Sequence, residues 1–198
     1  MTARAEALLA EMAEHRLRFE AFCRSLSSEE LATQVPGAPW TVFDYIAHLA
    51  TIETLINPWL GAMAGVSGIP LPEVAPPQPF DLDDWNGEIV ARRRGRSLDE
   101  VFAEAARNRQ AYADILGRLT DEQLDSKVPF GGDRRVIDLP PVMVPLVNLL
   151  TGIALHDPMH TQDMLRALPH RRGDPAVSEW LDSVDMSRVD PEMAARRA

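Results

Sequence analysis

The chain has 198 residues, and its 45% of hydrophobic and 25% of charged residues are ordinary for a globular protein. This length predicts one domain with a full-sized core. The formal net charge of −10 argues against nucleic acid and against an anionic membrane surface as partners, because both require clustered basic side chains.

The sequence carries no signal for targeting or for crosslinking. It opens with no basic-then-apolar leader, and no apolar run approaches the roughly 20 residues of a membrane-spanning helix. The single cysteine, Cys23, cannot form an internal disulfide. We therefore expect a cytoplasmic protein in a reducing compartment.

A long amphipathic helix is predicted over residues 3–26. One stripe of its residues follows the three-and-four spacing of a helical face, and only one member of the stripe is not apolar. The stripe consists of Leu8, Met12, His15, Phe19, Phe22 and Leu26. Ser27 and Glu30 then form a capping box that opens a short helical turn.

A second helix is predicted from residue 41 to a glycine at 61 or 65. Thr41 is suited to cap its N-terminus, and Asp44 lies in its first turn, near the positive end of the helix dipole. Two adjacent stripes of this helix are almost wholly apolar, so we expect it to be buried on more than one side. His48 lies in one of these stripes, near the middle of the helix.

Proline interrupts the chain after this helix. Residues 66–80 are rich in proline and cannot continue a helix, so we interpret them as a long surface crossover, with a lid as the alternative. A short helix carrying Trp85 and Asn86 is predicted over residues 81–94.

A third long helix is predicted over residues 97–119. Ser97 and Glu100 form the capping box that opens it. Asn108 occupies an otherwise apolar stripe of this helix. Residues 125–139 are predicted to form a loop.

The last long helix is predicted over residues 142–168, after a pair of prolines. One of its stripes begins with four aliphatic residues and then turns polar. In order, the stripe reads Val142, Leu146, Leu149, Ile153, His156, His160, Asp163 and Ala167. The two histidines are four residues apart, so their rings lie on one face about one turn apart. Pro158 lies between them and should bend the helix.

These segments predict an all-α protein. Four long amphipathic helices, a long crossover between the second and the third, and no convincing strand alternation are typical of a four-helix bundle. We place this bundle in residues 1–170. Residues 171–198 are predicted to be a tail with one short helix around residues 178–181.

Histidines within the apolar faces indicate a metal site. Buried imidazoles without a partner cost free energy, and helical bundles build metal sites from residues on facing helices. In an antiparallel bundle the depths of His48, His156 and His160 can coincide. Three neutral imidazoles around a divalent ion leave a coordination position open, and they do not choose between zinc, nickel and iron. The competing interpretation is that each histidine is a hydrogen-bonded core residue.

Three motifs together resemble the DinB superfamily, in particular its branch of mycothiol-dependent maleylpyruvate isomerases and bacillithiol or mycothiol transferases. The motifs are WTVFDYIAHLA at residues 40–50, DWN at 84–86 followed by RRR at 92–94 and SLDEV at 97–101, and HDPMHTQD at 156–163. The resemblance implies a four-helix bundle with a metal bound by three histidines, one on the second helix and two on the last. By that match, His48, His156 and His160 are the metal ligands.

Several other polar residues are candidates for the same site. Asp163 would accept a hydrogen bond from the second ring nitrogen of His160, or would be a solvated carboxylate at the helix end. His15 is expected to line the catalytic pocket rather than to act as a fourth ligand. Further candidates for lining a substrate or cofactor pocket are Asn108, Trp85 and Arg109, with a surface role as the alternative for Arg109.

The resemblance also implies a low-molecular-weight thiol, mycothiol or another, as cosubstrate. A divalent ion with three neutral ligands would favour the thiolate, which would attack a small electrophile in an S-transfer or an isomerisation. Two alternatives stay open: a hydrolase or lyase that uses metal-activated water, and a small-molecule-binding bundle without turnover. The oligomeric state is left open, with a homodimer as one alternative.

Overall fold

The computed structural model describes residues 1–75, 81–130, 141–191 and 193, and helices dominate this part of the chain. The helices are α1 (Ala3–Arg24), α2 (Ser28–Ala32), α3 (Val42–Leu49), α4 (Ile52–Met63), α5 (Leu82–Ala91), α6 (Leu98–Leu116), α7 (Asp121–Asp125), α8 (Leu146–Ala154), α9 (His156–Ala167) and α10 (Pro175–Asp182). Two 3-10 turns (Pro169–Gly173 and Met186–Arg188) and two short strands, β1 (Lys127–Phe130) and β2 (Val142–Pro145), complete it. None of the described helices combines the length and hydrophobicity that a membrane span requires.

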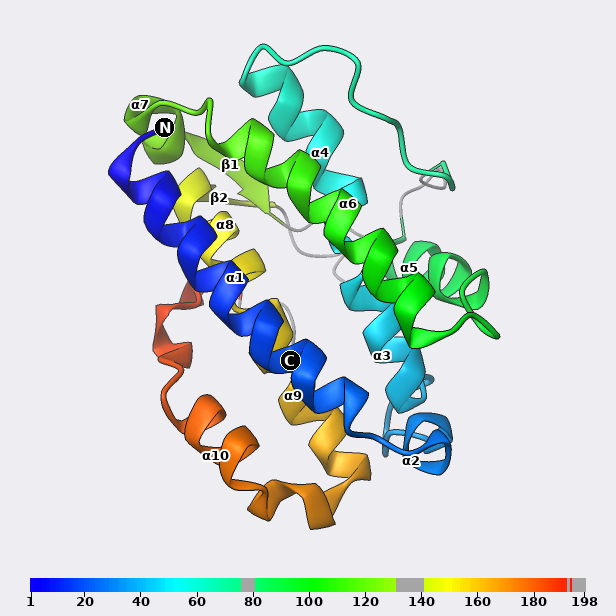
Figure 1. The fold of residues 1–198 in the computed structure, drawn as a ribbon. Coiled ribbons are helices and arrows are strands. Elements are labelled where there is room, and N and C mark those ends of the chain that lie inside the picture. The colour runs from blue at the N-terminus through cyan, green and yellow to red at the C-terminus, as the bar shows by residue number, and fades with distance from the viewer. Residues whose placement is uncertain (76–80, 131–140, 192, 194–198) are drawn as a thin grey trace.

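The mostly helical architecture confirms the predicted all-α class, while the four-helix bundle itself stays a prediction. Helices α1 and α6 run antiparallel in front in Figure 1, and α1 also packs against α8 and α9. Helix α3 packs against α9, α5 and α6. The capping boxes predicted at Ser27 and Ser97 are both formed. The predicted N-cap Thr41 also forms one, because the Asp44 side chain accepts from the Thr41 amide.

Two of the predicted long helices are interrupted. The helix that we predicted from residue 41 divides into α3 and α4 at Ala50 and Thr51, where the Thr51 hydroxyl donates to the carbonyl of His48. The helix predicted over residues 142–168 divides at Leu155. Pro158 explains this second break, because it lacks the amide that would bond the carbonyl of Ala154 and its ring crowds that oxygen.

The prediction that the chain has no strand, and that a helix starts at residue 142, was wrong. Strands β1 and β2 pair as an antiparallel hairpin, with Lys127 opposite Pro145 and Phe130 opposite Val142. Val128 and Val144 turn inward from it into the core. Each strand has only four residues. A pattern this short does not distinguish a strand from one turn of an apolar helix. The rest of the loop predicted over residues 125–139, beyond residue 130, lies outside the described residues.

The apolar core has two large clusters that are separated by polar residues. One cluster contains the second half of α1, α3, the start of α6, the end of α9 and α10. The other contains the first half of α1, α4, the end of α6, the hairpin and α8. Between them lies a set of mostly buried side chains that we call the polar layer: Arg16, Thr51, Glu53, Asn57, Asn108, Arg109, His156, Asp157 and Thr161.

The residues after 170, which we predicted to form a tail, contribute to the core. Helix α10 places Val177 and Trp180 in the same cluster as Phe19 and Phe22 of α1. The indole nitrogen of Trp180 donates to Nδ1 of His15 at 3.1 Å. His15, the polar residue in the α1 stripe, therefore has its hydrogen-bond partner in the C-terminal region.

Replacing Trp180 by alanine should destabilise the whole protein and not only α10. Removal of a fully buried Trp side chain costs about 3–5 kcal/mol of unfolding free energy, because the cavity closes only in part. Urea unfolding measures the loss. Leu17→Ala is the control, since Leu17 lies on α1 with 73% of its surface exposed and should change the stability little. Equal stability of the two variants would contradict the packing role of α10.

Candidate metal centre

Three histidines from two helices meet where the last turn of α3 faces the start of α9. His48 comes from α3, and His156 and His160 come from α9. Each offers one ring nitrogen such that these atoms all lie within 4.8 Å of one another. The ring centroids are 5.9 Å apart for His48 and His156, 5.3 Å for His48 and His160, and 4.9 Å for the α9 pair.

The donor set and its burial fit a divalent transition metal. His48 and His156 are buried, and His160 is partly exposed. Neutral imidazole is a suitable ligand for zinc, nickel and iron, and three such ligands leave room for an exchangeable fourth. The cluster could therefore hold a metal ion.

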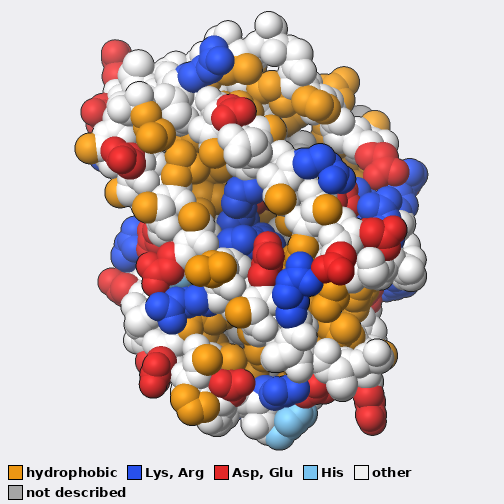
Figure 2. All heavy atoms as spheres, viewed as in Figure 1, with side chains coloured by type: hydrophobic (Ala, Val, Ile, Leu, Met, Phe, Trp, Pro, Cys, Tyr) orange, Lys and Arg blue, Asp and Glu red, His pale blue; other side chains and the backbone are white. Residues whose placement is uncertain are grey.

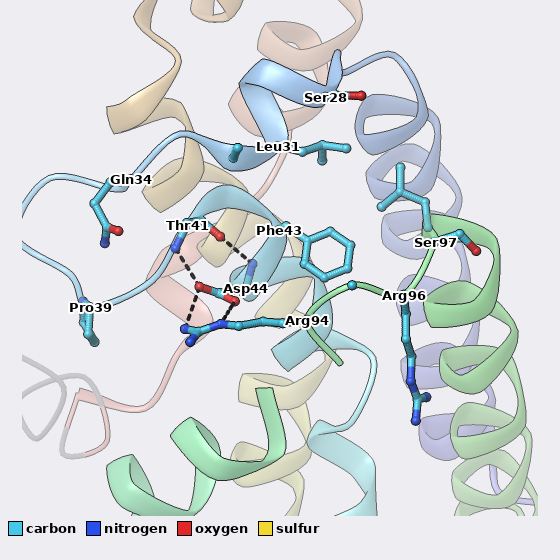
Figure 3. Close-up of a pocket in the computed structure, with 13 residues that line it drawn as sticks. Ser28, Leu31, Gln34, Pro39, Thr41, Phe43, Asp44, Arg94, Arg96 and Ser97 are labelled. Atoms are coloured by element: carbon cyan, nitrogen blue, oxygen red, sulfur yellow. Dashed lines mark hydrogen bonds and ion pairs between the residues drawn. The ribbon is translucent and has the colours of Figure 1, made fainter. Parts of the chain in front are cut away.

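The helix that carries His48 is fixed at its start by a capping box and an ion pair. The Thr41 amide donates to Asp44 at 3.0 Å, and the Asp44 amide donates to the Thr41 hydroxyl at 3.2 Å. Arg94 donates to both oxygens of the same carboxylate, at 3.0 and 3.1 Å (Figure 3). Burial raises the pKa of Asp44, but the Arg94 and Thr41 hydrogen bonds outweigh it and hold the pKa below its ordinary value. His48 follows one turn later on this anchored helix.

The interruption at Leu155 makes His156 the first residue of α9. Because Pro158 ends the previous helix rather than bending a continuous one, both histidines belong to the same new helix. Their rings are 4.9 Å apart, so the spacing of four residues still places them on one face.

Asp163 lies against the ring of His160. Its Oδ2 lies 2.9 Å from Nδ1 of His160, and Arg166 lies 3.7 Å from its other oxygen. A carboxylate at Nδ1 favours the tautomer with the proton on that nitrogen, which leaves the Nε2 lone pair for a ligand. Of the two predicted alternatives for Asp163, the contact to His160 is the one that the structure contains.

An aromatic wall, consisting of Trp40 and Tyr45, borders the histidines and was not singled out from the sequence. The Trp40 ring lies 5.0 Å from that of His48, and the Tyr45 ring lies 5.3 Å from that of His160. Tyr45 precedes His48 by three residues, a spacing that puts both on one helical face. That spacing is the signal that could have identified Tyr45.

His15 is not part of the histidine cluster, although we predicted it to line the catalytic pocket. It packs against Trp180, with ring centroids 6.2 Å apart. Burial lowers the pKa of His15, which favours the neutral ring, the form that accepts the indole hydrogen bond. The partner comes from a segment 165 residues away, which no local pattern indicates.

The structure also gives Asn108 and Trp85 partners of their own. Asn108 donates to the carbonyl of Ala50 at 2.8 Å and so gives a hydrogen-bond partner to a backbone carbonyl just after the end of α3. The indole of Trp85 donates to the carbonyl of Val74 at 2.9 Å, in a small cluster that attaches the crossover to α5. The side-chain nitrogens of Asn108 and Trp85 thus form hydrogen bonds that join different segments of the chain.

Arg109 belongs to a buried ion-pair network. It donates to Glu53 at 2.8 Å and lies 3.5 Å from Asp157, which also pairs with Arg16 at 2.9 Å. Of this network only Arg109 was a candidate from the sequence. The position of Asp157 between the two histidines was the signal that could have identified it.

Two hollows in the described part of the chain lie beside the cluster rather than on it. The larger, about 720 Å³, is lined by residues of α2, the start of α3 and the segment before α6, and includes Asp44 and Arg94 (Figure 3). The smaller, about 370 Å³, lies between α1 and α6, where Figure 2 shows basic side chains at its floor. Arg16 and Arg109 belong to its lining.

The fold and the three-histidine cluster define a helical protein of the DinB-like class. The chain also matches the family model described as the mycothiol maleylpyruvate isomerase N-terminal domain, over residues 12–139. This match covers more than half of the chain, so the protein belongs to that family, as its motifs predicted. A search of the curated proteins found no match. The matched segment includes His48 and ends before His156.

Asp44→Asn should weaken the anchor of α3 in a pH-dependent way. A carboxyl whose pKa is lowered on folding stabilises the folded state above its ordinary pKa of 3.8, and this contribution is lost as the pH falls through the lower, folded-state value. At about pH 7 we expect the variant to lose about 1–2 kcal/mol of unfolding free energy.

Urea unfolding at several pH values measures this difference, which should shrink below about pH 4 because the wild-type carboxyl becomes protonated. Asp99→Asn is the control, because Asp99 pairs with Arg24 on the exposed surface. A difference between wild type and Asp44→Asn that stays constant with pH would refute the role of the charge.

Proposed function

We propose that this protein is a metal-dependent enzyme that uses a low-molecular-weight thiol, of the mycothiol type, in an S-transfer or isomerisation of a small electrophile. The observation that carries the proposal is the meeting of His48, His156 and His160 from two separate helices within 4.8 Å. Membership of the mycothiol maleylpyruvate isomerase N-terminal domain family supports the thiol as cosubstrate. We place this reaction in the cytoplasm.

The residues around the cluster have distinct tasks in this proposal. A divalent ion, when bound, would lower the pKa of the thiol and so supply a thiolate near neutral pH. The three imidazoles would hold the ion and, as neutral ligands, would leave its full charge in place. Asp163 holds the His160 ring in the tautomer that offers Nε2. Trp40 and Tyr45 form an apolar wall that excludes water from one side of the site.

Metal content tests the ligand assignment directly. We expect the protein, purified without an affinity tag, to carry about one divalent transition metal per chain. His160→Ala should lose this metal, because two imidazoles alone bind it weakly. His170→Ala should retain it, since His170 lies on the surface and contacts Glu30. Elemental analysis of the three proteins measures the content, and full metal content in His160→Ala would refute the assignment.

Turnover with a panel of thiols tests the chemistry. The metal-loaded protein is incubated with mycothiol, bacillithiol or glutathione and a general electrophile such as monochlorobimane, and the S-conjugate is quantified. We expect conjugation that requires both thiol and metal, because the thiolate is the nucleophile. Electrophile hydrolysis without thiol would favour metal-activated water. Tight binding without turnover would favour a binding protein.

A further inference from the structure

A buried ion-pair network lies directly behind the histidine cluster. It consists of two guanidinium groups, of Arg16 and Arg109, and two carboxylates, of Glu53 and Asp157. Both carboxylates are 1% exposed. Buried charges are costly unless they are paired and hydrogen-bonded, so the positions of these four side chains are strongly coupled.

Arg16 joins the two helices that carry the histidines, and it does so at the residues next to them. Its Nη2 donates to the carbonyl of Leu49 at 3.0 Å and to Asp157 Oδ1 at 2.9 Å. Leu49 directly follows His48, and Asp157 directly follows His156. One nitrogen of α1 thus bridges the chain beside two of the three imidazoles.

This bridge forms where the two helices are interrupted. Leu49 is the last residue of α3, so its carbonyl is one of those that no helical amide satisfies. His156 is the first residue of α9. The end of a helix is held by fewer backbone hydrogen bonds than its interior. A hydrogen bond from another helix therefore has more influence on where that end lies.

Arg109 pairs with the other oxygen of the Asp157 carboxylate. Its Nη1 lies 3.5 Å from Asp157 Oδ2, and its Nε donates to Glu53 of α4 at 2.8 Å. Asp157 therefore receives one guanidinium from α1 and one from α6. Because its charge is compensated in this way, Asp157 serves as an anchor of α9 beside the cluster.

We infer that Arg16 is a positioning residue for the metal centre: by bridging Leu49 and Asp157, it sets the separation of His48 from the two histidines of α9. This inference rests on the proposed metal site. The bridge is specific in geometry, because a planar guanidinium offers its hydrogen bonds in fixed directions, whereas an apolar residue of similar size would fill the space without fixing a distance.

Arg93 provides a matched control within the same chain. It is also buried, pairs with Glu104 and Glu73, and donates to the carbonyl of Ile89 at 2.9 Å. Its partners lie on α5, α6 and the crossover and are not adjacent to any of the three histidines. Arg93→Met thus removes a similar buried ion pair without touching the bridge.

The test compares Arg16→Met, Arg16→Lys and Arg93→Met with wild type. Zinc affinity is measured by competition with a chromogenic chelator, and the cobalt-loaded proteins give the geometry through their visible absorption. We expect Arg16→Met to bind zinc about 10–100-fold more weakly, with one ion still bound at saturation and a changed cobalt spectrum. Arg93→Met should keep the wild-type affinity and spectrum, even if it is less stable to urea.

Arg16→Lys covers the case in which the methionine variant does not fold. Lysine restores the positive charge, but its side chain is one atom shorter and lacks the fixed donor directions of the guanidinium. It should recover stability while zinc binding stays weaker than in wild type. In the metal-free proteins, the ring NMR signals of His48 and His156 should shift in both Arg16 variants and stay in place in Arg93→Met.

The outcomes separate this inference from the proposed function. If wild type binds no metal, the proposed function fails, and the histidine signals of the metal-free proteins still decide the role of Arg16. If wild type binds zinc and the Arg16 variants match it in affinity and cobalt spectrum, the positioning role is overturned. An equal loss of affinity in Arg93→Met would overturn it too, since general destabilisation would then be the cause.

Discussion

The need to satisfy buried polar groups governs the centre of this protein. The polar layer crosses the molecule between two apolar clusters, and each cluster alone would be an ordinary helical core. Burying such groups costs free energy unless hydrogen bonds and opposite charges compensate them. In this layer the charged side chains are paired across helices, as in Arg16–Asp157 and Arg109–Glu53. Asp157 of this network directly follows His156, so the layer reaches the histidine cluster along the chain.

The helix interruptions and the polar layer occur at the same depth. Helix α3 ends at Leu49 and α9 begins at His156, and both ends expose backbone groups that a continuous helix would have satisfied internally. Side chains from neighbouring helices occupy these groups, since Arg16 donates to Leu49 and Asn108 donates to Ala50. The broken helices thus account for the presence of polar side chains inside the core. They also place His48 in the last turn of α3 and His156 at the start of α9.

The family membership and the site geometry bear on different parts of the chain. The family match covers residues 12–139 and so includes α3 with His48 and the partners Arg16, Glu53 and Arg109. The remaining histidines and Asp157 come from α9, beyond the match. Only the packing of α9 against α3 and α1 combines the two halves into one site. A proposal of metal chemistry therefore depends on the structure as well as on the family.

The sequence by itself determined the features that depend on neighbours within about four residues. The capping boxes at Ser27 and Ser97, the N-cap at Thr41, the extent of α1 and the shared face of His156 and His160 are of this kind. Helix ends and faces follow from local spacing. The tertiary structure alone decided the pairing of β1 with β2 and the burial of Trp180 against His15. It also decided the partners of Arg109 and Asn108, which from the sequence were candidates for lining a substrate or cofactor pocket. These contacts join residues far apart in the chain, such as Arg16 and Asp157 at a separation of 141 positions, and their energies depend on burial that no local pattern contains.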